Sequence, residues 1–148
     1  MKTTALFLSL LLGGSTLLGL RMPQDQEPLG EDELREHMES IEDAVKRLRR
    51  SLRDPANLAE SLELVARMQS DALVCKGLVP PLADTLPEAE RAAFCAAFRR
   101  MMVDFLGAQL ELEAALLDGD AEKADAAFAR VRDFEDTGHE RFTLEEDE

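Results

Sequence analysis

Apolar residues recur every three or four positions along most of this chain, beginning near residue 31. From Leu34 to Leu52 they follow alternating steps of four and three residues, a series typical of a helix with one inward face. Beyond residue 30, no credible run alternates apolar and polar residues with the period of two that indicates a strand. The pattern therefore predicts an all-α domain.

Residues that favour helix starts and helix ends divide the first half of this domain into two helices. Asp54 can cap a helix and Pro55 fits a first helical turn, so the first helix is expected over about residues 31 to 52. The second helix is expected to stop at Gly77 and at the Pro80-Pro81 pair, which favour a helix end. Its apolar stripe comprises Leu58, Leu62, Val65, Met68, Ala72 and Cys75.

The second half contains two further helices. One opens near Pro87, and Gly119 is expected to end it because glycine readily adopts the left-handed conformation found just past helix ends. Asp120 can then cap the last helix, expected over about residues 121 to 142. Short connections make successive helices antiparallel, so residues 31–142 are predicted to form an up-down-up-down antiparallel four-helix bundle.

The two ends of the chain have a different composition. Lys2 precedes an apolar run from Ala5 to Leu20, and Arg21 and a polar stretch follow it, which predicts a secretory signal peptide over residues 1–21. The run is shorter than the roughly 20 residues that a membrane-spanning helix needs, which favours cleavage over anchoring. We expect a disordered linker over 22–30, an acidic tail over 143–148, and a periplasmic protein without stable membrane insertion.

The charge of the chain narrows the class of partner. The 148-residue chain has a formal net charge of −14, which disfavours nucleic acid and anionic lipid. Such a surface suits a basic partner protein or serves solubility alone.

In an exported chain the two cysteines, Cys75 and Cys95, could form a disulfide or could be small buried thiols. We expect a monomer.

Two residues stand out as candidate iron ligands. The predicted topology brings the start of the first helix and the end of the last helix together, so Met38 lies level with His139. At about 100° per residue from Phe128, His139 falls about 20° away, at the edge of the apolar face. A thioether and an imidazole at one end of a bundle form an axial pair that haem iron accepts.

The same two residues also allow a simpler interpretation. A methionine at helical spacing commonly fills a core, and a histidine at the edge of an apolar face is commonly half-exposed. The other histidine, His37, points about 100° away from the stripe that holds Met38, so it is expected at a solvated or rim position. A divalent-metal site is disfavoured because the sequence has only two histidines and no H-x-x-x-H pair.

Several segments resemble the cytochrome b562 family, which consists of periplasmic haem-binding four-helix bundles. They are "REHMESIEDAV", "ARMQSDALVCKGLVPP", "AAFRRMMVDFLGAQLELEAALLDGDAEKADAAF" and "EDTGHERF", and the similarity extends from Leu34 to Phe142. Gly107, Gly119 and His139 match two family glycines and the family's ligand histidine without a gap. This chain departs from the family around the histidine, where Gly138 replaces an aromatic residue and Glu135 replaces a basic one.

The resemblance implies a non-covalent b-type haem with Met38 and His139 as its axial ligands. The sequence has no C-x-x-C-H motif for covalent haem attachment. The implied pocket residues are Leu34, Ile41, Phe98, Met102 and Phe142, with Arg141 as the candidate contact for the propionates.

We therefore expect an exported electron-transfer protein rather than an enzyme, with a basic redox partner. Two filled axial positions would leave no open site on the iron for a substrate. The alternative is a haem-free exported bundle that binds a basic protein through its acidic faces.

Overall fold

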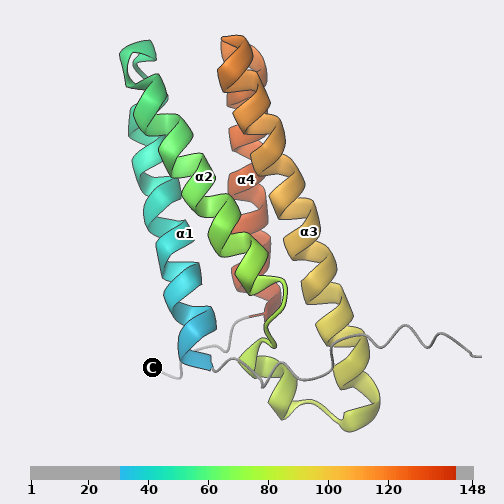
Figure 1. Cartoon of the computed structure of the whole chain (residues 1–148). Coiled ribbons are helices and arrows are strands. Elements are labelled where there is room, and N and C mark those ends of the chain that lie inside the picture. Colours follow the sequence, from blue (N-terminus) through green and yellow to red (C-terminus); the bar gives the residue numbers. More distant parts are fainter. Residues whose placement is uncertain (1–30, 143–148) are drawn as a thin grey trace, which may run out of the picture.

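A computed structural model describes residues 31–142 of the chain and shows four helices joined by short turns (Figure 1). They are α1 (Glu31–Ser51), α2 (Leu58–Cys75), α3 (Glu88–Asp118) and α4 (Ala121–Phe142). Two short 3-10 turns, η1 (Pro55–Asn57) and η2 (Pro81–Thr85), lie on either side of α2. The described range contains no strand, and the predicted all-α four-helix bundle is confirmed.

The helix ends follow the predicted capping residues closely. The Asp54 side chain accepts the backbone N–H of Ala56, although it caps η1, which leads into α2, rather than α2 itself. Gly119 has a φ of 68° and ends α3 in the left-handed conformation that glycine adopts without strain. The Asp120 carboxylate then accepts the backbone N–H of Lys123 at 3.1 Å in the first turn of α4.

The core lies along the bundle axis and is built from the predicted inward stripes. Leu48, Val65, Leu112 and Val131 are completely buried, one from each helix. Leu58 does not join the core as its stripe predicted, because it is the first residue of α2, and it is 41% exposed. Burial of these apolar side chains is the main stabilising contribution to such a bundle.

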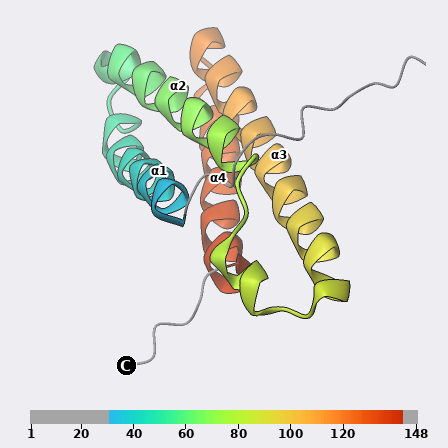
Figure 2. The same ribbon diagram turned by 60° about the horizontal axis from the view of Figure 1, so that its bottom comes forward.

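The four sides of the bundle are not equally close. α1 packs along α2, α2 along α3, and α3 along α4, whereas the backbones of α1 and α4 scarcely approach each other. Figures 1 and 2 show the ribbons of α1 and α4 standing apart near the end where α1 begins and α4 ends. This α1–α4 side is the one on which the sequence places the candidate iron ligands.

Predictions for both chain ends concern residues outside the described range. The signal peptide over 1–21, the linker over 22–30 and the acidic tail over 143–148 all belong to this group. Among the described helices, none combines the length and the apolar character needed to cross a membrane.

Candidate functional site

A small cavity lies between α1, α3 and α4 at the end of the bundle where α1 begins. Four predicted site residues line it together: Met38 and Ile41 from α1, Met102 from α3 and His139 from α4. The volume of the cavity is about 20 Å³. The fold therefore brings the sulfur-bearing and imidazole-bearing side chains to one place, as the topology predicted.

Burial differs sharply among the residues of this cavity. Met102 is almost completely buried, Met38 is half-buried, and His139 is exposed at the outer edge. Gly138, rather than its neighbour His139, turns its backbone into the protein, and a Cβ placed on it would meet the side chain of Met101 at 3.4 Å. The imidazole of His139 therefore lies at the rim, where both solvent and the cavity are accessible.

The remaining predicted pocket residues lie elsewhere at this end. The ring of Phe142 packs on Phe98 at 5.3 Å and on Phe94 at 5.2 Å between ring centroids, so these rings form a separate aromatic cluster. Leu34 is buried in the core. Arg141 is exposed, and its guanidinium carbon lies 5.2 Å from the centre of the Phe142 ring.

Two carboxylates that the sequence did not single out as site residues also line the cavity. Glu42 lies one turn after Met38 on α1, and Glu135 lies one turn before His139 on α4. Partial burial raises the pKa of Glu135 and the charge of Glu42 raises it further, whereas His139 lowers it. The four-residue spacing from each candidate ligand could have identified both carboxylates.

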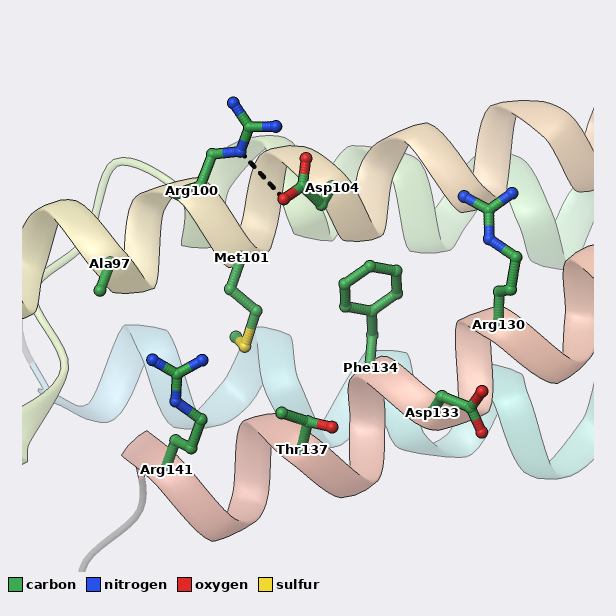
Figure 3. Close-up of a pocket in the computed structure, with 9 residues that line it drawn as sticks. All are labelled: Ala97, Arg100, Met101, Asp104, Arg130, Asp133, Phe134, Thr137 and Arg141. Atoms are coloured by element: carbon green, nitrogen blue, oxygen red, sulfur yellow. Dashed lines mark hydrogen bonds and ion pairs between the residues drawn. The ribbon is translucent and has the colours of Figure 1, made fainter.

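Two more apolar residues of the cavity, Met101 and Phe134, also line a larger groove between α3 and α4. Figure 3 shows both side chains pointing into the space between these helices. The groove has a volume of about 440 Å³ and is lined by Ala97, Arg100, Met101, Asp104, Arg130, Asp133, Phe134, Thr137 and Arg141.

The arginines of the groove do not form a strong anion site. Arg100 pairs with Asp104 at 2.9 Å, and Arg130 pairs with Glu111. Asp133 supplies a further negative charge in the groove that also contains Arg141. The nearby acidic charges therefore offset the three basic ones, and the groove has no excess charge with which to hold an ionic ligand.

His37 lies at a partly exposed position, with 27% of its side chain exposed, as expected for a rim residue. It faces α2, where its Nδ1 lies 2.7 Å from Oδ1 of Asp71, a partner that the sequence did not predict. Ser40 donates to Oδ2 of the same carboxylate at 2.6 Å, and Arg67 donates to the Ser40 hydroxyl at 3.0 Å. The periodicity of α1 gave the direction of His37 but could not reveal an acid on α2 opposite it.

The two cysteines are free thiols. Cys75 is completely buried, and Cys95 is half-buried near the start of α3. Burial, together with the nearby charge of Asp71, raises the pKa of the Cys75 thiol to about 12. Cys75 therefore belongs to the core as a neutral side chain, the second of the two alternatives that the sequence left open.

Whether haem fits this site depends on the donor atoms that the cavity offers and on the volume of the cavity. The donors fit, because a thioether from α1 and an imidazole from α4 meet at one cavity. The volume does not fit in the conformation described, since about 20 Å³ is far below the roughly 300 Å³ or more of typical cofactor pockets. A macrocycle could enter only if α1 and α4 moved apart.

Neither the models of known protein families nor the curated proteins match this chain. The resemblance to the cytochrome b562 family therefore stays a hypothesis that rests on the spacing of the quoted segments. Within residues 31–142, no group of three or more His, Cys, Asp and Glu side chains could hold a metal ion.

Proposed function

We propose that this chain is an exported electron carrier that holds a non-covalent b-type haem between α1 and α4. The observation that supports it most directly is that Met38 and His139, from opposite ends of the sequence, line one cavity. They do so on the side of the bundle where two helix backbones scarcely approach. That side is the one that can widen with the least loss of helix packing.

In this proposal each residue has a defined task. The sulfur of Met38 and an imidazole nitrogen of His139 would hold the iron, and Ile41 and Met102 would supply apolar contacts. When bound, the haem provides one-electron redox chemistry at its iron. Two protein ligands leave no iron position for a substrate, so the proposal is electron transfer and not catalysis.

Opening of the α1–α4 side depends on side chains that can repack. Met38, Met101 and Met102 all border the cavity, and methionine adapts to irregular spaces because its chain is unbranched and flexible. The like charges of Glu42 and Glu135 face this side and oppose its closure. Both features favour widening here over widening at the α1–α2 interface.

The proposed setting is the periplasm, with the protein acting as a monomer. Its net charge of −14 suits a basic redox partner, because opposite charges accelerate encounter. The same charge disfavours nucleic acid as a partner. Association with the partner should therefore weaken as salt concentration rises.

A hemin titration followed by visible absorption tests the haem proposal. Wild-type protein should give a saturable haem spectrum, and acid extraction should remove the haem. His139→Ala and Met38→Ala should each alter the spectrum, whereas His37→Ala is the matched control because Asp71 holds that imidazole away on α2. A wild-type protein that stays colourless would refute the proposal.

A haem-free acidic interaction module is the second candidate, and the closed cavity of about 20 Å³ favours it. Under this function Met38 only fills space, so Met38→Leu should change the free energy of unfolding by less than about 1.5 kcal/mol. Salt-sensitive binding of a basic protein by a colourless chain would support this candidate over the first.

A further inference from the structure

The size of the cavity between α1, α3 and α4 suits an occupant much smaller than a macrocycle. A space of roughly 10–15 Å³ is enough to hold one water-sized particle. The cavity has a volume of about 20 Å³ and therefore admits a single ion without movement of the helices.

Sulfur-bearing side chains predominate among the possible metal ligands around this cavity. Three methionine thioethers, from Met38, Met101 and Met102, line it together with the imidazole of His139. The sulfur of Met101 lies 3.6 Å from the point that a Cβ on Gly138 would occupy, next in sequence to His139. Figure 3 shows the Met101 side chain extending from α3 toward α4.

This donor set discriminates among metal ions. Thioethers are soft ligands that select Cu(I), and imidazole also binds copper, whereas Mg²⁺ and Ca²⁺ require several oxygen ligands. The two carboxylates at the cavity, Glu42 and Glu135, lie on opposite helices. Their charges would be partly neutralised by a single positive charge between α1 and α4.

We propose that this cavity is a Cu(I) site in which the sulfurs of Met38 and Met101 and a nitrogen of His139 are the ligands. Met102 lines the same space and can supply a further thioether. The site shares Met38 and His139 with the proposed haem site, so the two occupants exclude each other. The Cu(I) proposal does not require haem binding.

A substitution of Met101 can distinguish the Cu(I) proposal from the haem proposal, because Met101 is a proposed ligand of Cu(I) only. Met101→Leu conserves volume and removes one thioether, while it leaves both proposed haem ligands in place. We expect this variant to lose Cu(I) affinity by about tenfold or more, while any haem that it binds keeps the spectrum given by the Met38 and His139 ligands. His139→Ala should weaken both. Met68→Leu is the matched control, because Met68 is completely buried on α2 and does not line the cavity.

The affinity should be measured anaerobically by competition for Cu(I) with a coloured chelator. Because free thiols also bind Cu(I), the measurement uses a Cys75→Ala/Cys95→Ala background. We expect one Cu(I) per chain in that background. The Cu(I) proposal would be overturned if the cysteine-free protein did not compete with the chelator for Cu(I). It would also be overturned if Met101→Leu in that background bound Cu(I) as tightly as the background itself. Neither outcome would change the hemin result.

A second measurement keeps the test valid if the cysteine-free chain does not fold. Wild-type protein labelled with ¹³C in its methionine methyl groups is titrated with Cu(I) and followed by NMR. The methyl signals of Met38 and Met101 should shift with the first equivalent, while that of Met68 stays in place. Unchanged Met38 and Met101 signals at one equivalent would exclude the site.

Discussion

The two neighbours of α1 contact it in contrasting ways. Toward α2, hydrogen bonds cross the interface. The Asp71 carboxylate lies 2.7 Å from Nδ1 of His37 and accepts the Ser40 hydroxyl at 2.6 Å. Toward α4, the backbones scarcely approach, and Met38 and His139 meet at a small cavity. The α1–α2 interface therefore fixes geometry, whereas the α1–α4 side is filled by side chains that can rearrange.

This contrast bears directly on which side chain can reach a metal. His37 and Met38 are adjacent, so they project about 100° apart on α1. His37 faces Asp71 on α2, and the same rotation of α1 places Met38 at the cavity beside α4. The α1–α4 side therefore receives the thioether of Met38 and not the imidazole of His37.

The largest change in stability is expected when the hydrogen bonds between α1 and α2 are removed. Asp71→Ala should lower the free energy of unfolding by about 2 kcal/mol, because it leaves the His37 ring and the Ser40 hydroxyl without their partner in a partly buried place. Urea denaturation checks this value, with an unchanged m-value to show that the bundle still unfolds as one unit.

Asp104→Ala is the matched control for that measurement. Asp104 pairs with Arg100 at 2.9 Å on a solvated face of α3, where ion pairs contribute about 0–1 kcal/mol. Equal losses from Asp71→Ala and Asp104→Ala would contradict the distinction between the α1–α2 interface and ordinary surface pairs.

A smaller effect is expected at the cavity between α1, α3 and α4. Gly138→Ala should raise the free energy of unfolding by about 0.5–1 kcal/mol, because alanine is the better helix former. The added methyl group would meet the Met101 Cε at 3.4 Å, which is ordinary contact with the end of a flexible chain. Thermal and urea denaturation measure the gain.

Gly107→Ala provides the reference for this prediction. Gly107 also lies within a helix, and no atom beyond its sequence neighbours and its own helix backbone would come within 4 Å of its added Cβ. Similar gains at the two positions would show that Met101 yields freely. A loss at Gly138 beside a gain at Gly107 would show that Met101 is packed rigidly between α3 and α4 at the cavity.

The smallest effect concerns the carboxylates of the α1–α4 side. Because the pKa of Glu135 is raised above its ordinary value of 4.5, the folded state binds this proton more tightly than the unfolded state does. Its contribution to stability is therefore lost as pH rises from 4.5 through the raised pKa.

Glu135→Gln should remove this pH dependence. At pH 7 the variant should be more stable than wild type by less than about 0.5 kcal/mol, since solvent screens this partly exposed group. Near pH 4 the difference should vanish. Denaturation curves at both pH values provide the measurement, and a variant that is less stable at pH 7 would show that Glu135 has a stabilising partner.

Much of the fold could be predicted from sequence because its signals are local. The expected first helix, over about residues 31 to 52, differs from α1 by one residue at its C-terminal end, and the expected last helix has the bounds of α4. Capping by Asp120 and the left-handed Gly119 depend only on residues next to them. Side-chain partners on other helices carry no such local signal.

Gln109 and Phe142 illustrate what local signals leave out. Gln109 is completely buried in α3, and its side-chain oxygen and nitrogen have no hydrogen-bond partner within residues 31–142. Its spacing from Phe105 and Leu112 places it beside the inward stripe, but the sequence does not show that its amide has no polar partner there. Phe142 packs on Phe94 and on Phe98, which is itself an expected pocket residue, and no local signal in the sequence gives these contacts.

The sequence by itself determined the helices, their antiparallel order and the level at which Met38 and His139 meet, because periodicity and short turns act within neighbouring residues. Only the tertiary structure decided that Asp71 captures His37 and that Met101 joins the cavity. It also decided that this cavity has room for one ion in the conformation described. The physical reason is that helix spacing and rotation result from the packing of all four helices together.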